Sequence, residues 1–487
     1  MSPSTGSATP PRELSTGICV LGAGPAGLAA ALELARGGCS DVLVLDRNAT
    51  PGGLARTERF DGHRFDVGPH RFFTQNREVD ALWHEMLGED FQPVQRLTRI
   101  FYDQRFYLYP VSALDALPKL GPVAATRALA SYLWAAVARD AERAETFEQW
   151  VAAKFGSRLY ESFFKTYTEK VWGIPCSQIG ADWAAQRIKG LDLLGVAKNA
   201  FGVALGTRPK TLVDEFDYPV LGAGQMYERM AERAAAAGVT FCFDAEVRRV
   251  ERKDDRIAAV EALTADGPLR VAAERFVSTL PLTRLLEMLT PPPPAEVLAA
   301  CQALYYRDHI TVNLVAERAD LFPDQWIYVH DPQVRMARLA NYRNFSPRMA
   351  GTAGVSPISV EYFVFRDDEV WALDDASLIA MAGDEVVRMG LVPRGALGPG
   401  WVVRETDSYP TYYLGYAAPY DRVRRAIDGL VNLQPAGRGG LYKYNNMDHS
   451  LYSGLLAARN LLADPPGRYD VWRINIDAEY HEAAERR

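Results

Sequence analysis

The chain has 487 residues, of which 48% are hydrophobic and 24% charged, so it is long enough to bury sizeable cores in several domains. Its formal net charge of -7 offers no basic field for a nucleic-acid partner. The five cysteines are scattered without a CxxC pair, which excludes the usual zinc and dithiol motifs and favours a reducing cytoplasm; no metal site is predicted.

The two ends of the chain are predicted to be tails. Residues 1–16 are rich in Ser, Thr and Pro and lack an apolar run, so we expect disorder rather than a signal peptide. Residues 466–487 are expected to form a C-terminal tail. The most apolar helical stretch, 128–138, is shorter than the roughly 20 apolar residues that span a bilayer. We therefore expect a cytoplasmic protein without a transmembrane segment.

A βαβ unit with a glycine-rich turn opens the folded part of the chain. A short apolar strand over 18–21 precedes "GAGPAG", a helical pattern follows over 28–36, and "DVLVLDR" reads as a second strand. In such a turn the backbone approaches a pyrophosphate, whose charge the helix N-terminus stabilises. Asp46 ends the second strand, where a carboxylate can hold a ribose hydroxyl. The three glycines of this G-x-G-x-x-G motif are Gly22, Gly24 and Gly27.

Later segments favour FAD over NAD. "NATPGGLARTERFDG" resembles the extension that runs along FAD in amine-oxidase and glutathione-reductase flavoproteins. Val247 lies on a strand that meets the adenine in such proteins, and "AGRGGLYKYNNMDHS" resembles their C-terminal segment, whose helix points its positive end at the flavin. The residues expected to contact FAD are Gly22, Gly24, Pro25, Ala26, Gly27, Asp46, Arg47, Gly53, Leu54, Ala55, Gly68, Pro69, His70, Val247, Gly437, Arg438, Asn446 and Met447.

The nucleotide-binding pattern appears in separate pieces of the chain. We therefore predict an α/β fold: a Rossmann-like FAD-binding domain, discontinuous in sequence, with an inserted helical lobe and an antiparallel-sheet substrate domain. The expected boundaries are 17–75, 215–285 and 425–465 for the FAD-binding domain, 76–214 for the mainly helical substrate or lid lobe, and 286–424 for the antiparallel sheet.

Five segments carry a more specific resemblance. "GPHRFFT", "YTEKVWGIPCSQI" with "QRIKG", "YYRDHITV", "MARLANYRNF" and "GRGGLYKYNNMD" resemble motifs of UDP-galactopyranose mutases, over about Ile18 to Leu462. The resemblance implies a pyranose–furanose mutase that acts on a nucleoside diphosphate sugar, with N5 of reduced FAD as the nucleophile. It also implies that protein side chains mainly position the substrate and neutralise its charge.

The resemblance assigns roles to individual residues. His70 would face the flavin, two arginines would clamp the diphosphate, and aromatic residues would wall the pocket. Asn446 departs from the family, which has an acid there. His309, His330 and His449 are expected to be structural or on the surface. The catalytic residues implied are His70, Arg187, Arg338 and Tyr444. The substrate-binding residues implied are Trp172, Arg307, Tyr409, Tyr413 and Asn446.

A second function stays open at this point. The same FAD segments occur in oxidoreductases of the amine-oxidase and protoporphyrinogen-oxidase kind, which oxidise a small molecule. Converging arginines would favour the nucleotide sugar, since an apolar or amine substrate does not need them. The sequence leaves open the nucleotide, the sugar, the reductant, for which NAD(P)H is a candidate, and the oligomeric state.

Overall fold

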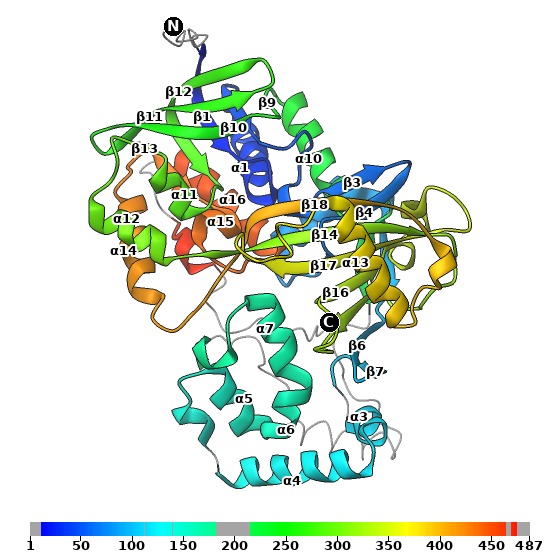
Figure 1. Cartoon of the computed structure of the whole chain (residues 1–487). Helices are drawn as coiled ribbons and strands as arrows, with labels where there is room; N and C mark the ends of the chain where they lie inside the picture. Colours follow the sequence, from blue (N-terminus) through cyan, green and yellow to red (C-terminus); the bar gives the residue numbers. More distant parts are fainter. Residues whose placement is uncertain (1–10, 112, 139, 182–214, 464–468, 475–487) are drawn as a thin grey trace, which may run out of the picture.

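The computed structural model describes residues 11–111, 113–138, 140–181, 215–463 and 469–474. They form three bodies: a helix-covered sheet, a second sheet beside it, and a helical lobe at the far end of the molecule (Figure 1). This arrangement confirms the predicted α/β fold with an inserted helical lobe.

The first body is built on an eight-stranded sheet in the order β13-β10-β11-β12-β1-β2-β9, with β19 also paired to β12. Its centre is parallel: β1 pairs with both β2 and β12 in parallel. β2 is the run "VLVL", in which all residues are buried, as expected for a strand covered on both faces. The strands are β1 (Arg12–Leu21), β2 (Val42–Leu45), β9 (Thr240–Cys242), β10 (Glu246–Lys253), β11 (Arg256–Thr264), β12 (Gly267–Ser278), β13 (Leu289–Thr290) and β19 (Leu433–Pro435).

Helices from distant parts of the chain cover this sheet. The Ala- and Leu-rich α1 starts with Pro25, a residue that suits the first helical turn, and packs against α16 and α10. α16 is buried along most of its length, so the C-terminal part of the chain is integral to the first body. The helices are α1 (Pro25–Arg36), α2 (Arg77–Leu87), α10 (Gly224–Ala236), α11 (Leu282–Glu287), α12 (Ala295–Ala303), α14 (Ala417–Asp428), α15 (Gly437–Leu441) and α16 (Met447–Leu462).

The second body is a seven-stranded sheet in the order β18-β14-β17-β16-β15-β6-β7. Its neighbours are antiparallel except β15 and β6, which run parallel. The strands are β6 (Thr98–Tyr102), β7 (Arg105–Leu108), β14 (Tyr306–Ala316), β15 (Trp326–Val329), β16 (Arg338–Asn341), β17 (Ser356–Val364) and β18 (Leu397–Pro410), and α13 (Asp375–Arg388) packs on this sheet.

The helical lobe is the third body. It has its own aromatic core and approaches the second sheet through α7. Its helices are α3 (Ala113–Leu120), α4 (Pro122–Ala138), α5 (Phe147–Phe155), α6 (Ser157–Tyr160) and α7 (Thr166–Trp172). Two small ribbons join the bodies: β3 (Thr57–Phe60) with β4 (His63–Asp66), and β5 (Phe91–Gln95) with β8 (Glu215–Pro219).

Several expected boundaries need correction. β1 begins at Arg12, inside the expected N-terminal tail, because its first residues pair with β12. β6 and β7 fall in the stretch 76–214 but join the second sheet, since β6 pairs with β15. Trp472 is buried in a short 3-10 helix, Val471–Arg473, within the expected C-terminal tail. Among the described residues, no helix combines the length and the apolar character needed to cross a bilayer.

Candidate active site

A cavity of about 1020 Å³ runs between the two sheets and collects most of the predicted site residues. Every residue predicted to contact FAD lines it except Gly27. The predicted catalytic residues Arg338 and Tyr444 and the predicted substrate-binding residues Tyr409 and Asn446 line it as well. The cavity therefore joins the two predicted halves of the site in one continuous space.

The glycine-rich turn forms one wall of the cavity. Gly22 has a φ of +105°, a left-handed conformation that suits glycine. A Cβ on Gly27 would lie 1.8 Å from the Gly22 carbonyl oxygen, so only glycine lets α1 pack this closely. Gly27 thus acts through packing, and α1 begins at Pro25 with its N-terminus at the cavity.

Asp46 marks the nucleotide end of the cavity. Its carboxylate accepts hydrogen bonds from the backbone N–H groups of Ala23 (2.6 Å) and Asn48 (2.7 Å). Burial raises its pKa, while these hydrogen bonds oppose the change. Val247 lines the same end from β10. The carboxylate is therefore held rigidly where the second strand of the βαβ unit ends.

A second helix N-terminus reaches the cavity from the C-terminal segment. Gly437 has a φ of +79°, and its N–H donates to Ser453 Oγ (2.8 Å). Asn446 caps α16 in a reciprocal capping box with His449, so His449 is structural, as predicted. Two helices separated by more than 400 residues of chain thus present their positive ends to one space.

His70 lies at the other end of the cavity. Gly68, two residues before it, has a φ of +89° and leaves room for the side chains of β16 and β17. Burial lowers the pKa of His70 to about 3, and the charges of Arg438 and Arg338 act in the same direction. The imidazole is therefore neutral near pH 7. Its buried Nδ1 meets no hydrogen-bond partner of normal geometry within the described chain.

Arg338 is held at this end by a buried carboxylate that the sequence did not reveal. Glu361, on β17, contacts Arg338 Nη2 at 2.5 Å and His309 Nε2 at 2.9 Å. Burial alone would raise the pKa of Glu361, but Arg338 and His309 lower it to about 2. Glu361 in turn raises the pKa of Arg338 well above its usual value, although burial opposes this. The His70 end of the cavity, which we call the chamber, thus holds an ion pair. His309 also lines the cavity.

Arg438 is a second cation in the same chamber. Its guanidinium lies 4.7 Å from the ring centroid of Tyr409 and 5.1 Å from that of Tyr444. The rings of Tyr409 and Tyr444 are 5.5 Å apart. Trp326 and Tyr328, which the sequence did not single out, add aromatic surface from β15. The chamber therefore combines two guanidinium groups with aromatic walls.

Three predicted substrate residues lie outside the lining of this cavity. Trp172 is buried in the lobe core, although its ring lies 5.8 Å from that of Tyr444, which lines the cavity. Arg307 donates to the carbonyls of Lys170 and Val171 at the end of α7, which gives its guanidinium a structural task. The hydroxyl of Tyr413 donates to the carbonyl of Ala303 (2.7 Å). Arg187 lies outside the described residues.

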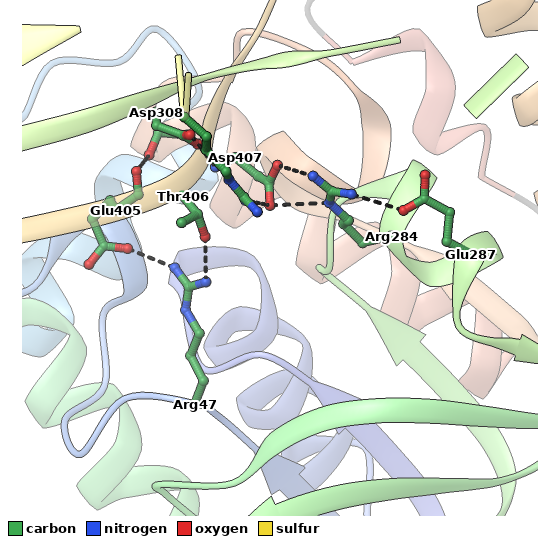
Figure 2. Close-up of polar contacts among 9 residues, drawn as sticks. Arg47, Arg284, Glu287, Asp308, Glu405, Thr406 and Asp407 are labelled. Carbon is green, nitrogen blue, oxygen red and sulfur yellow. Dashed lines mark hydrogen bonds and ion pairs between the residues drawn. The ribbon is translucent and has the colours of Figure 1, made fainter. Parts of the chain in front are cut away.

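Polar side chains from β18 line the nucleotide half of the cavity. Figure 2 shows Arg47 reaching Glu405 (2.8 Å) and Thr406 (3.0 Å), and Arg284 between Asp407 and Glu287. Glu405 is also 2.5 Å from Arg56 of the first body and is almost fully buried. Arg47 therefore lines the cavity, while its guanidinium binds Glu405 and Thr406 of the second sheet. The sequence did not single out β18 for this role, because Arg47 and Arg284 lie 358 and 123 positions from their partners Glu405 and Asp407.

The geometry of this cavity fits FAD. Positive-φ glycines let the backbone approach a ligand, two helix N-termini suit a pyrophosphate, and the buried imidazole of His70 lines the cavity. Fold and cavity together define a dinucleotide-binding flavoprotein with an added second sheet. The model of flavin-containing amine oxidoreductases matches residues 25–462, and the chain belongs to that family. The protein is an FAD-dependent enzyme.

Individual relatives differ in what they do. A hydroxyneurosporene desaturase of Rhodobacter capsulatus is 30% identical over 51% of this chain and 53% of its own length. A "probable UDP-galactopyranose mutase" of Klebsiella pneumoniae is 30% identical over 34% of this chain and 43% of its own length. The chain thus spans about half the length of these relatives. The crystal structure of a reduced UDP-galactopyranose mutase superposes with a TM-score of 0.81 at 20% identity, covering 95% of this chain and 98% of that one, which shows a shared fold.

Proposed function

We propose that the enzyme interconverts the pyranose and furanose forms of a nucleoside diphosphate sugar, without net oxidation. The observation that carries this proposal is the pair of guanidinium groups, Arg338 and Arg438, at the His70 end of the cavity. Both act on His70 strongly enough to contribute to its lowered pKa. A single carboxylate, Glu361, contacts Arg338, so these three charges leave an excess of one positive charge in the chamber. That excess suits an anionic leaving group.

The side chains that line the chamber have different roles in such a reaction. Reduced FAD, when bound, supplies an electron-rich ring nitrogen as nucleophile. Arg338 and Arg438 stabilise the negative charge that grows on the departing diphosphate, with guanidinium forks that match phosphate oxygens. Neutral His70 would lie against the bound flavin without repelling either arginine, and Tyr409 with Tyr444 would orient the sugar nucleotide. Asn446 adds no negative charge, which keeps the chamber positive.

A direct assay tests this reaction. The purified enzyme is reduced with dithionite under anaerobic conditions and incubated with UDP-galactose, UDP-arabinose, and GDP- and dTDP-sugars. The expected product has the same mass as the substrate and a changed ring size, as measured by chromatography and NMR. If every sugar nucleotide returns unchanged while flavin and fold are intact, the proposal is wrong.

The arginine clamp has its own prediction. Arg338→Ala is expected to weaken nucleotide-sugar binding by about 1.5 kcal/mol or more, because a charge-assisted hydrogen bond is lost. Titration calorimetry on the flavin-loaded protein measures the change. Arg335→Ala is the matched control, since Arg335 is half exposed and pairs with the exposed Glu369. If the Arg338 and Arg335 variants bind the nucleotide sugar with equal affinity, Arg338 does not contact the diphosphate.

A second candidate function is oxidation of an apolar or amine small molecule. It is favoured by the aromatic lining of the chamber, Trp326, Tyr328, Tyr409 and Tyr444, and by the relative named as a hydroxyneurosporene desaturase. Such an activity would require an electron acceptor and would give a product two hydrogens lighter. The two functions are separated by the acceptor requirement, because an isomerase turns over without one.

A further inference from the structure

The outer face of α4 is an apolar surface that the proposed reaction does not use. The inner side of this helix is seated on the turn between α5 and α6: a Cβ on Gly156 would lie 2.7 Å from the backbone of Ser131. Ala128 and Ala135 are the buried residues of α4. The helix is therefore firmly packed on one side through small residues and open on the other.

The open side carries large apolar side chains at helical spacing. We call this set the α4 face: Val123 (65% exposed), Leu129 (50%), Leu133 (55%), Trp134 (77%) and Val137 (80%). Positions 123, 129, 133, 134 and 137 fall within an arc of about 140° on a helix with 3.6 residues per turn, on the side away from Ala128 and Ala135. Leu114 of α3, 66% exposed, adds to the apolar surface of the lobe. Exposed apolar side chains that are grouped on one face of a helix, rather than scattered singly, mark an interaction site.

The charge of α4 selects the kind of partner. Among its 17 residues, Arg127 is the sole charged side chain, so the helix has a cation and no carboxylate. A second copy of α4 would offer Arg127 no opposite charge, whereas anionic lipid headgroups offer phosphate oxygens. Tryptophan also prefers the boundary between the apolar and headgroup regions of a bilayer. Lipid thus matches the cation, the indole and the apolar side chains together.

The position of α4 suits a flat partner. The helix runs along the outer edge of the lobe, with α5 and α6 on its inner side, and lies at the opposite end of the molecule from the sheet of the first body (Figure 1). A planar surface can therefore contact α4 along its length, about 25 Å at 1.5 Å per residue. We propose that the α4 face docks the enzyme on the surface of a bilayer that contains anionic lipid. This proposal does not depend on the reaction proposed above.

Vesicle flotation of the full-length, flavin-loaded enzyme tests the proposal. Vesicles of phosphatidylcholine with about one third phosphatidylglycerol are compared with phosphatidylcholine alone. The wild type is expected to float with the anionic vesicles, and Arg127→Gln is expected to reduce the preference for anionic lipid. The triple variant Leu133→Ser, Trp134→Ser, Val137→Ser is expected to lose at least about tenfold in vesicle partitioning, because apolar burial is lost.

A matched variant controls for loss of exposed apolar side chains in general. Leu263→Ser with Val431→Ser removes two side chains that are 53% and 56% exposed elsewhere on the molecule, and is expected to float like the wild type. An unchanged flavin spectrum and melting temperature verify the fold of all variants. The proposal is overturned if the wild type does not float, or if the triple variant floats equally well. It is also overturned if sedimentation shows a dimer that the triple variant loses while vesicle binding is absent.

Discussion

Arg338, Glu361 and His309 show how a charge is kept in a buried site. A lone buried charge is very costly, so the guanidinium is placed against a carboxylate, and the carboxylate also accepts a hydrogen bond from the imidazole of His309. The three residues come from β16, β17 and β14, which are neighbours in the sheet. Glu361 thereby fixes the guanidinium of Arg338, and His309 in turn fixes Glu361.

Removing the charge of Glu361 tests this support. Glu361→Gln keeps the size of the side chain but leaves Arg338 without its counter-charge, so we expect a loss of about 3 kcal/mol in the free energy of unfolding. Urea denaturation measures it. Glu369→Gln, at a side chain that is 79% exposed, is expected to change stability little. Equal stabilities for the two variants would contradict the role of Glu361.

The histidine of the "GPHRFFT" turn predicts a pH dependence. The pKa of His70 is lowered from 6.5 to about 3 in the folded protein. At pH values between about 3 and 6.5, His70 is therefore protonated in the unfolded chain and neutral in the folded protein. The free energy of unfolding consequently decreases as the pH falls below about 6.5. The slope contributed is up to about 1.4 kcal/mol per pH unit.

Denaturation as a function of pH measures this slope. His70→Gln should flatten the fall in stability between about pH 6.5 and pH 4, because the titrating group is gone. His84→Gln is the control, since the His84 side chain is 56% exposed. A wild-type slope in the His70 variant would show that other groups cause the acid sensitivity.

At the scale of elements, α1 and α16 bring two N-termini to one cavity. Their axes can approach because Gly454 of α16 lies against the backbone of α1: a Cβ there would be 2.0 Å from the carbonyl oxygen of Ala26. Gly27 makes the equivalent close contact with the turn before α1. The pyrophosphate and flavin ends of the site are thus aligned through glycine contacts in helices that are far apart in the chain.

Gly454→Ala is expected to disturb this alignment. The added methyl group forces α16 away from α1, which should cost about 1–3 kcal/mol of stability and lower the FAD content of the purified protein. Absorbance near the flavin bands, per protein, measures the second effect. Gly395→Ala, where a Cβ meets no atom within 4 Å, should leave both quantities unchanged. Full FAD occupancy in the Gly454 variant would contradict the argument.

At the scale of the whole molecule, β18 ties the second sheet to the first body across the nucleotide half of the cavity. Glu405 accepts from Arg47, which ends the βαβ unit, and pairs with Arg56 of the following loop (Figure 2 shows the contact with Arg47). Asp407 is held by Arg284 of α11. The cavity predicted to hold FAD is lined from both bodies, so we expect these contacts to help retain the cofactor.

Glu405→Gln is expected to speed the release of FAD. Loss of the two ion pairs should raise the dissociation rate of FAD by about tenfold, equivalent to about 1.4 kcal/mol. The recovery of flavin fluorescence after dilution measures the rate. Asp384→Asn, which breaks an exposed pair with Arg394 on the second body, is the control. An unchanged rate would mean that β18 does not retain the cofactor.

The lining of the cavity on its nucleotide side could largely be predicted from the sequence, because those lining residues lie in short local motifs. The turn around Gly22, the "GPHRFFT" turn and the "AGRGGLYKYNNMDHS" segment each bring their own backbone to the cavity. Glu361 and Glu405 were not predicted, since their partners are brought by other strands. A carboxylate inside the apolar run "ISVEYFV" was the available signal for Glu361, because an unpaired charge is rarely buried.

The sequence by itself determined the dinucleotide-binding class, the cofactor and the α/β plan. Glycine spacing and strand periodicity are patterns over a few neighbouring residues, so they can be recognised in the sequence alone. The tertiary structure alone decided which arginines face the chamber: it brought Arg338 and Arg438 together and turned Arg307 to the end of α7. It also left the α4 face open. Such outcomes depend on which strands and helices become neighbours, and that contact is made between residues hundreds of positions apart.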